Sequence, residues 1–323
     1  MDVPDDGRSS DQITPAAPSV TLPRRQFGRS QRLVSEIGFG CGGFWGLPVF
    51  SERKAEALLR YGLDRGITFL DTGPNYSGGK AEARLGKLTG GRYTGVMLAT
   101  KVGSRLLPNG RVVRDFTPEG MEASLRDSLR RLKSDHVDLL QLHGPALATI
   151  ADDRVLGALD GFVARGMITY KGVSADGDVA LHVAKSRFFD ALMTTYNVLV
   201  RESLPALKTA SGNGMAVLVK SPLSHHVFGR DLFKLTSLSR VWYLLRVLKN
   251  YRHLMARGRR LKLGQCMPGW TAAEIALKFV LRESAVSSAV VGTTRLDHLR
   301  QNLGVAAKGE LSLELLAAID GPG

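Results

Sequence analysis

Side chains suited to proton transfer follow three consecutive apolar runs of the sequence. Asp71 and, a few residues later, Tyr76 come after one run, and Lys101 and His143 come after the next two. A neighbouring ammonium stabilises a phenolate, so Lys101 beside Tyr76 is expected to bring the phenol pKa down from its ordinary value of about 10. Asp71 would hold Lys101 in an ion pair, and a neutral His143 would orient a substrate carbonyl. These residue types predict proton transfer at a carbonyl or hydroxyl oxygen.

Each of these residues alone has an ordinary structural explanation. Asp71 and Lys101 could form a structural ion pair, and His143 could be a satisfied residue of the core. Their joint occurrence at consecutive strand ends favours a functional site.

Eight short apolar, β-branched runs supply candidate strands that could bring these residues together, and segments with helical spacing lie between them. Strands that are apolar on both faces and alternate with helices favour a parallel sheet. Eight such repeats in 323 residues favour an α/β fold of the (β/α)8 TIM barrel type, in which the carboxyl ends of the strands share one mouth. The expected strands are 34–39, 67–70, 96–99, 137–142, 168–173, 191–195, 215–219 and 286–291.

Two segments depart from this alternation. Residues 24–35 precede the first repeat and predict a β-hairpin that turns at Gly28 and plugs the bottom of the barrel. Residues 225–268, after the seventh strand, are far longer than an ordinary connection and predict a lid-like insertion. We expect one barrel domain over residues 21–323 and a disordered tail over residues 1–20.

The charge of the chain is strongly basic, with a formal net value of +14, and much of the excess lies in residues 240–262. Within a lid this stretch would present a solvated positive face. It could also attract a phosphorylated or carboxylated substrate, the phosphates of a cofactor, or an acidic membrane surface. The two cysteines suggest neither a disulfide scaffold nor a metal cluster, and no segment predicts a signal peptide or a membrane span. We expect a cytoplasmic protein with no metal and no nucleic-acid partner.

Three motifs resemble the catalytic segments of the aldo-keto reductase superfamily in order and spacing: DTGPNYSGGKAEARLG, LATKVG and VDLLQLHGP. The resemblance covers residues 25–306. It implies that Asp71, Tyr76, Lys101 and His143 form the catalytic tetrad of that family, with Tyr76 as the general acid for reduction and the general base for oxidation. It also implies hydride transfer between a nicotinamide cofactor, NADP(H) rather than NAD(H), and a small aldehyde, ketone or sugar-like substrate.

The resemblance further implies a cofactor site at the ends of the later strands. Residues 290–302 would hold the adenosine half, where Arg295 or Arg300 could bind a 2′-phosphate. A helix that begins near Thr294, which forms a capping-box-like pair with Asp297, would also suit a phosphate. The candidate cofactor residues are Ser174, Asn197, Lys220, Ser221, Pro222, Leu223, Gly292, Thr293, Thr294, Arg295, Gln301 and Asn302.

The nicotinamide contacts depart from the family pattern at three positions, Ala175, Met193 and Lys220. We expect Ser174 and Asn197 to compensate. These departures are also compatible with a non-catalytic, NADP-binding regulatory barrel. The basic charge is compatible with a protein that binds nucleic acid or a membrane surface.

Two aromatic residues follow the first expected strand. Phe44 and Trp45 lie at the carboxyl end of this strand, where barrel enzymes bind substrate. We expect both to line the substrate pocket.

Overall fold

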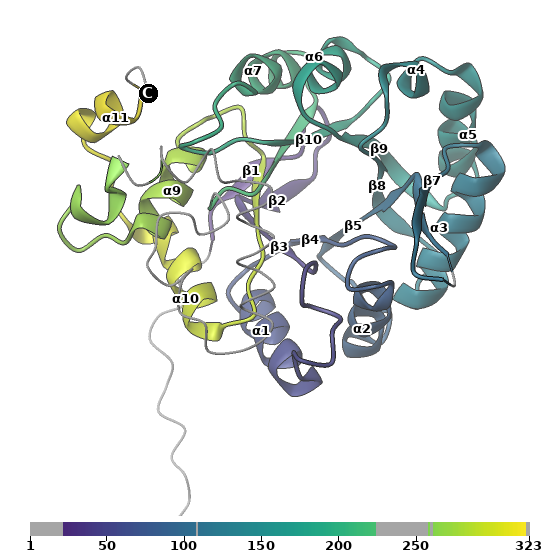
Figure 1. The fold of residues 1–323 in the computed structure, drawn as a ribbon, viewed down its shortest axis with the longest axis horizontal. Coiled ribbons are helices and arrows are strands. Elements are labelled where there is room, and N and C mark those ends of the chain that lie inside the picture. The colour runs from purple at the N-terminus through teal and green to yellow at the C-terminus, as the bar shows by residue number, and fades with distance from the viewer. Residues whose placement is uncertain (1–21, 108, 224–257, 259–260, 321–323) are drawn as a thin grey trace, which may run out of the picture.

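The computed structural model describes residues 22–107, 109–223, 258 and 261–320, and its centre is a closed parallel barrel (Figure 1). Neighbouring strands follow the order β10-β11-β12-β3-β4-β5-β8-β9, so the barrel closes between the last and the first of its strands in the sequence. The barrel strands are β3 (Ile37–Gly40), β4 (Phe69–Asp71), β5 (Met97–Val102), β8 (Val137–His143), β9 (Ile168–Ser174), β10 (Ala191–Thr195), β11 (Ala216–Lys220) and β12 (Ser288–Val291).

The predicted barrel is confirmed, and each of the eight predicted runs contributes one of its strands. The first run is divided, because residues 34–35 pair with an earlier strand and β3 begins only at Ile37. The remaining strands begin or end within a few residues of the predicted positions, as expected when boundaries are inferred from apolar runs alone.

Helices surround the barrel (Figure 1), and hydrogen bonds from side chains fix where several of them begin. The Ser51 and Thr117 side chains cap two of them, and Thr271 with Glu274 forms a capping box at the start of a third. The helices are α1 (Glu52–Asp64), α2 (Lys80–Thr89), α3 (Pro118–Leu132), α4 (Leu147–Ile150), α5 (Asp153–Ala164), α6 (Gly177–Lys185), α7 (Leu204–Gly212), α9 (Ala272–Leu281), α10 (Leu296–Gly304) and α11 (Leu313–Asp320), with short 3-10 turns η3 (Leu263–Gln265) and η4 (Val305–Ala307).

The amino-terminal hairpin closes one end of the barrel, as predicted. Strands β1 (Arg24–Gln26) and β2 (Leu33–Ser35) pair antiparallel. The Phe27 ring between them is buried among the inward-facing side chains, 5.0 Å from the Tyr170 ring. Gly28 has a φ of +57°, and a Cβ at this position would lie 2.6 Å from the Ala216 nitrogen. The turn therefore fits against the barrel only because it lacks a side chain.

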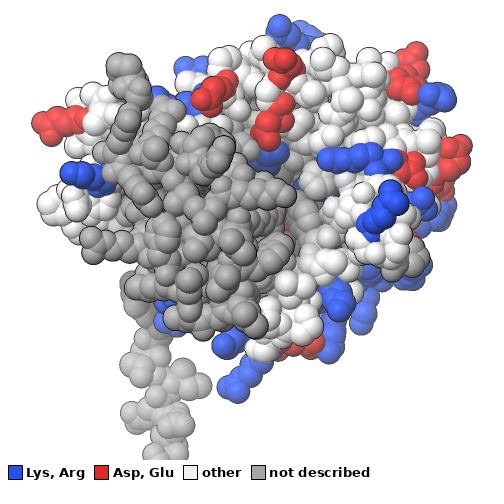
Figure 2. Space-filling view, in the orientation of Figure 1, with Lys and Arg blue, Asp and Glu red and all other residues white. Residues whose placement is uncertain are grey.

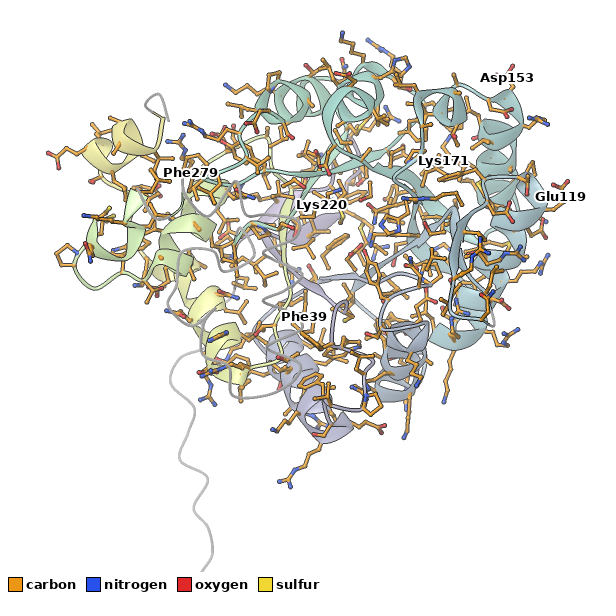
Figure 3. All side chains as sticks on the ribbon, viewed as in Figure 1. Phe39, Glu119, Asp153, Lys171, Lys220 and Phe279 are labelled. Atoms are coloured by element: carbon orange, nitrogen blue, oxygen red, sulfur yellow. The ribbon has the colours of Figure 1, made fainter. Side chains whose placement is uncertain are left out.

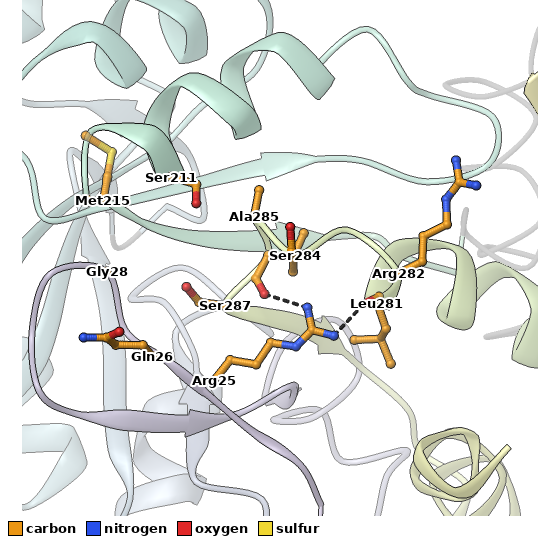
Figure 4. A pocket seen from close by; sticks show the side chains of 12 residues that line it. Arg25, Gln26, Gly28, Ser211, Met215, Leu281, Arg282, Ser284, Ala285 and Ser287 are labelled. Carbon is orange, nitrogen blue, oxygen red and sulfur yellow. Dashed lines mark hydrogen bonds between the residues drawn. The ribbon is translucent and has the colours of Figure 1, made fainter. Parts of the chain in front are cut away.

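Arg25 joins this hairpin to the connection between α9 and β12. Its guanidinium forms a salt bridge with Glu36 at 2.9 Å and donates hydrogen bonds to the carbonyl oxygens of Glu283 and Val286. A pocket of about 550 Å³ lies beside it (Figure 4), at the end of the barrel opposite the carboxyl ends of the strands. Because protein oxygens already surround the guanidinium, we regard Arg25 as a structural link.

A second hairpin, absent from the sequence predictions, follows β5. Strands β6 (Ser104–Leu106) and β7 (Val112–Arg114) pair antiparallel. They begin directly after the carboxyl end of a barrel strand, so this hairpin borders the mouth where active sites of such barrels form.

Two predicted segments, the tail over 1–20 and residues 225–257 of the insertion, lie outside the described residues, which also omit 259–260. Most of the basic stretch 240–262 is therefore undescribed. Within the described part, no helix has the length and apolar character required to span a bilayer.

We predict that Gly28→Ala lowers the free energy of unfolding by about 2–4 kcal/mol, because it adds a steric clash to an unfavourable φ. Gly166→Ala is the matched control. Gly166 also has a positive φ, of +69°, but a Cβ there would meet nothing within 4 Å. The control should lose only about 1 kcal/mol in urea denaturation. Equal losses in the two variants would contradict the close approach of the hairpin to the barrel.

Candidate active site

The side chains that face the barrel interior change from apolar to polar toward the carboxyl ends of the strands. Successive residues of a strand face opposite sides, so inward positions recur every second residue. On β5, Met97 and Ala99 belong to the inner apolar cluster, and Lys101 continues their row. Phe69 leads to Asp71 on β4 in the same way, and Leu139 leads to Gln141 and His143 on β8. The alternation therefore brings the polar side chains of neighbouring strands to one mouth.

Asp71 and Lys101 form a buried ion pair at this mouth. The Lys101 Nζ lies 2.7 Å from both carboxylate oxygens of Asp71 and donates a further hydrogen bond to the Thr72 carbonyl at 2.7 Å. Both residues are at most 5% exposed. Burial acts to lower the pKa of the Lys101 ammonium, but the interactions with Asp71 and Tyr76 together outweigh burial, and the net pKa lies above its ordinary value. Lys101 is therefore a fixed positive charge.

Tyr76 lies against this ion pair, held between two glycines. The Lys101 Nζ is 4.8 Å from the centre of the ring. Added Cβ atoms at Gly42 and Gly73 would lie 3.1 and 3.3 Å from ring carbons, so small residues on both sides leave room for the ring. The structure brings Tyr76 and Lys101 together, as the sequence predicted.

The predicted direction of the Tyr76 pKa is wrong. Burial raises the pKa of the phenol above its ordinary value, and the Lys101 ammonium opposes this rise only in part. The free-energy cost of removing the phenolate from water is larger than the stabilisation that the Lys101 ammonium gives it. Tyr76 therefore carries its proton throughout the neutral pH range.

His143 faces Tyr76 from β8 and is neutral. The two rings lie 6.0 Å apart with an edge-on geometry. Burial, together with the positive charges of Lys101, Arg114 and Lys220, lowers the pKa of His143 to about 3. Its Nδ1 is buried without a hydrogen-bond partner among the described residues. A lone pair is cheaper to leave unpaired there than an N–H group, which favours the tautomer with the proton on Nε2.

Gln141 is a polar member of this site that the sequence predictions missed. It is fully buried, and its amide nitrogen donates to the Asp71 carboxylate at 3.0 Å, so Asp71 has a second donor besides Lys101. The sequence carried one signal for it, since Gln141 lies two residues before His143 and shares its face of the strand.

The predicted nicotinamide residues differ in whether their polar side-chain groups are already engaged within the protein. Ser174 ends β9, on the row that faces the interior. The Asn197 side chain donates to the Ser221 carbonyl and accepts from the backbone nitrogens of Leu199 and Val200, so its polar groups hold a loop together.

Lys220 ends β11, and Figure 3 shows it over the middle of the barrel. It forms a salt bridge with Asp176 at 2.9 Å. Pro222 and Leu223 continue the chain after Ser221, and the Leu223 side chain is buried. Of the family departures, Met193 is buried in the inner apolar cluster and Ala175 is also buried.

The start of α10 differs from the prediction for residues 290–302. The expected capping box between Thr294 and Asp297 is wrong, because Arg295 occupies the capping position and no side chain caps the helix. The Asp297 carboxylate instead accepts hydrogen bonds from the Arg295 guanidinium, and the Thr293 hydroxyl accepts from the Arg295 backbone nitrogen. Asp297 therefore pairs with Arg295, two residues before it, and does not form the capping box with Thr294 that the sequence indicated.

The other candidates of this segment lie close to the helix. Gly292 follows β12 beside the Gly40 carbonyl. Gln301 donates to the Thr271 hydroxyl at 2.7 Å, and Asn302 is buried with its amide nitrogen unpaired within the described part of the chain.

The two aromatic residues predicted to line the substrate pocket differ in burial. Trp45 is 1% exposed and packs edge-on against Phe39 at 5.4 Å, so it belongs to the hydrophobic core. Phe44 is half-buried. A role in substrate binding stays a prediction for both.

Comparisons with known proteins match nearly the whole chain. A family model described as "Aldo/keto reductase family" matches residues 36–321. The uncharacterized oxidoreductase YqkF of Bacillus subtilis is 27% identical over 312 residues, which cover 92% of this chain and 95% of that protein. Among solved structures, the holo form of an aldo-keto reductase from Bacillus halodurans matches with a TM-score of 0.76 and 28% identity, over 92% of this chain and 95% of that one. The residues matched by the family model include all the barrel strands.

We predict that Asp71→Asn and Lys101→Met each lower the free energy of unfolding by about 3–5 kcal/mol, because each leaves a buried charge without its partner. The double variant should lose less than the sum of the two, since it leaves neither charge. Urea denaturation measures all three. Glu56→Gln, which breaks an exposed pair with Arg60 on α1, is the control and should change stability by less than about 0.5 kcal/mol. Strict additivity of the two site variants would argue against the ion pair.

Proposed function

The chain belongs to the aldo/keto reductase family, and on that premise we propose that it is an NAD(P)H-dependent oxidoreductase that reduces the carbonyl group of a small aldehyde, ketone or sugar-like substrate. The family resemblance inferred from the sequence motifs is confirmed. One observation carries the finer proposal: a protonated phenol, a buried ammonium and a neutral imidazole lie together at one barrel mouth, contributed by Tyr76, Lys101 and His143.

In this proposal Tyr76 donates the proton that the substrate oxygen acquires. Its raised pKa keeps the proton available at neutral pH. The fixed charge of Lys101 stabilises the phenolate that the donation leaves behind, and Asp71 keeps Lys101 charged and in place. His143, through the N–H on Nε2, donates a hydrogen bond to the same oxygen and orients the carbonyl.

A nicotinamide cofactor would supply the hydride, and the described residues fit such a group. The α10 helix begins without a side-chain cap just after the carboxyl end of β12, an arrangement that suits a phosphate. Gly292 and Asn302, whose amide nitrogen has no hydrogen-bond partner among the described residues, lie in the same segment. Because Asn197 and Lys220 are engaged within the protein, we assign the contact with the carboxamide to Ser174.

We propose NADP(H) in preference to NAD(H). Two cations lie along α10 and support recognition of a 2′-phosphate. Arg295 pairs with Asp297 at the start of the helix, and the Arg300 guanidinium lies 5.4 Å from the centre of the Tyr61 ring.

The non-catalytic regulatory barrel and the basic binding protein are less favoured candidates. Both leave the arrangement of the tetrad side chains without a chemical role, whereas the matched family model is described as one of aldo/keto reductases. The basic stretch 240–262 that motivated binding to nucleic acid or membrane lies largely outside the described residues.

Removal of the Tyr76 hydroxyl tests the proposed role. We predict that Tyr76→Phe lowers kcat/KM for aldehyde reduction by about 10²–10⁴-fold while the Kd for NADPH changes little, because the ring and the ion pair remain. Tyr93→Phe is the control, since the Tyr93 hydroxyl donates to the Leu132 carbonyl and has no described contact with the tetrad, so the variant should keep full turnover. Wild-type turnover of Tyr76→Phe would refute the assignment.

The pH dependence of reduction provides a second test. The active form has Tyr76 protonated and His143 neutral. The Tyr76 pKa is raised and the His143 pKa is about 3, so neither group should titrate between roughly pH 5 and pH 9. We expect kcat/KM to be flat over this range and to fall only at higher pH, as the phenol loses its proton. An alkaline decrease that begins near neutrality, or an acidic limb near the ordinary histidine pKa of about 6.5, would contradict these assignments.

A further inference from the structure

Arg114, at the end of the β6–β7 hairpin, is fixed beside His143. Its Nη1 donates to the Ser104 hydroxyl at 2.8 Å and to the backbone carbonyl of His143. A Cβ added to Gly144 would lie 3.3 Å from Nη2, so the guanidinium approaches the backbone at a glycine with a φ of +61°. The side chain is therefore anchored at the mouth by two oxygens from different strands.

Both partners of Arg114 are neutral oxygens, whereas the other cations around His143 face carboxylates. Lys101 pairs with Asp71, and Lys220 pairs with Asp176. Within the described residues, no carboxylate forms a salt bridge with Arg114. Its charge is uncompensated there, and it adds to the lowering of the His143 pKa. Figure 2 shows both basic and acidic side chains on the described part of this face of the molecule.

The hydrogen bonds already made leave one edge of the guanidinium available. Nη1 carries two N–H groups and has two acceptors. The Nε–H group and the two N–H groups of Nη2 have no acceptor among the described residues. Nε–H and one N–H of Nη2 point in parallel from one side of the plane, which matches the two oxygens of a carboxylate.

We propose that Arg114 forms a subsite for the carboxylate of the substrate, so that the preferred substrates are small carbonyl compounds that also carry a carboxylate. The inference rests on the proposed function, because it presumes that the carbonyl binds at Tyr76 and His143. Arg114 binds the His143 backbone directly, so the carboxylate lies only a few bonds from the reacting carbon. Arg114 orients the substrate and takes no part in proton transfer.

A pair of substrates that differ in charge tests the subsite. The probes are 4-carboxybenzaldehyde and its neutral methyl ester, reduced with NADPH by the full-length protein. We expect the wild type to have the higher kcat/KM for the acid. Arg114→Gln should lower the acid-to-ester ratio of kcat/KM by about tenfold or more, and Arg114→Lys by less, because lysine keeps the charge but loses the paired donors.

Arg111→Gln is the matched control. It removes one positive charge from the same hairpin and, like Arg114, Arg111 is exposed, but none of the Arg111 side-chain atoms has a described contact with the site. Its acid-to-ester ratio should stay within about twofold of the wild-type value, since exposed charges are screened by solvent and salt. An equal fall in Arg111→Gln and Arg114→Gln would attribute the preference to general electrostatics and overturn the subsite.

A binding measurement separates this inference from the proposed reaction. Calorimetric titration with 4-(hydroxymethyl)benzoate, which has the carboxylate but an alcohol in place of the aldehyde, should give a Kd about tenfold or more weaker in Arg114→Gln than in the wild type. If neither aldehyde is reduced while this difference persists, the reductase proposal fails and the subsite stands. If the ester and the acid are reduced equally well and the Kd is unchanged in the variant, the reductase stands and the subsite is overturned.

Discussion

A buried ammonium must have a buried carboxylate beside it, and the pairing of Lys101 with Asp71 sets the conditions for the rest of the site. Burial of either charge alone would cost several kcal/mol, so the two strands that carry them must be in a register that lets the side chains meet. The β4–β5 pairing provides this, with Asp71 opposite Ala99 and Lys101 two residues farther along. Gln141 and the Thr72 carbonyl supply the remaining hydrogen bonds. Burial keeps both Tyr76 and His143 neutral, and the positive charge of Lys101 adds to this effect for His143 and opposes it for Tyr76.

An arginine lies at each end of the barrel, and the two differ in how many of their donors already have acceptors within the protein. At the lower end, the Arg25 guanidinium is surrounded by backbone carbonyls and by Glu36, and the nearby pocket of about 550 Å³ has no tetrad residue in its wall. At the upper end, Arg114 meets only the Ser104 hydroxyl and one carbonyl. Satisfied donors hold the fold together, whereas donors left over near a reaction centre can recognise a ligand.

The sequence predicted best those features that depend on the periodicity of strands and on the order of the strands in the barrel. Apolar runs and their polar ends were enough to predict the barrel, the amino-terminal hairpin and the meeting of Tyr76 with Lys101, because strand periodicity and barrel closure are local and topological rules. The sign of the Tyr76 pKa required the depth of burial, which arises from Gly42 and Gly73 on separate segments.

Arg114 and the start of α10 illustrate the same limit. Nothing in the sequence indicated that residue 114 lies on the carbonyl of residue 143, since the contact spans 29 positions and depends on a hairpin that the apolar pattern did not indicate. The spacing of Thr294 and Asp297 satisfied a helix-start pattern, but Arg295 offered the carboxylate a charged partner two residues away. Which of several possible partners a side chain binds depends on the three-dimensional arrangement, which sequence spacing alone does not give.

The closure of the barrel between β12 and β3 has a consequence for synthesis on the ribosome. The first strand pairs with residues 289–291, and Arg25 binds carbonyls in the same late region. A nascent chain therefore exposes the free edge of β3 until almost the whole protein has emerged, and such an edge is prone to pair with other chains. Pairing of this edge with residues 289–291 is therefore a late step, and shielding of β3 until then would reduce aggregation of the nascent chain.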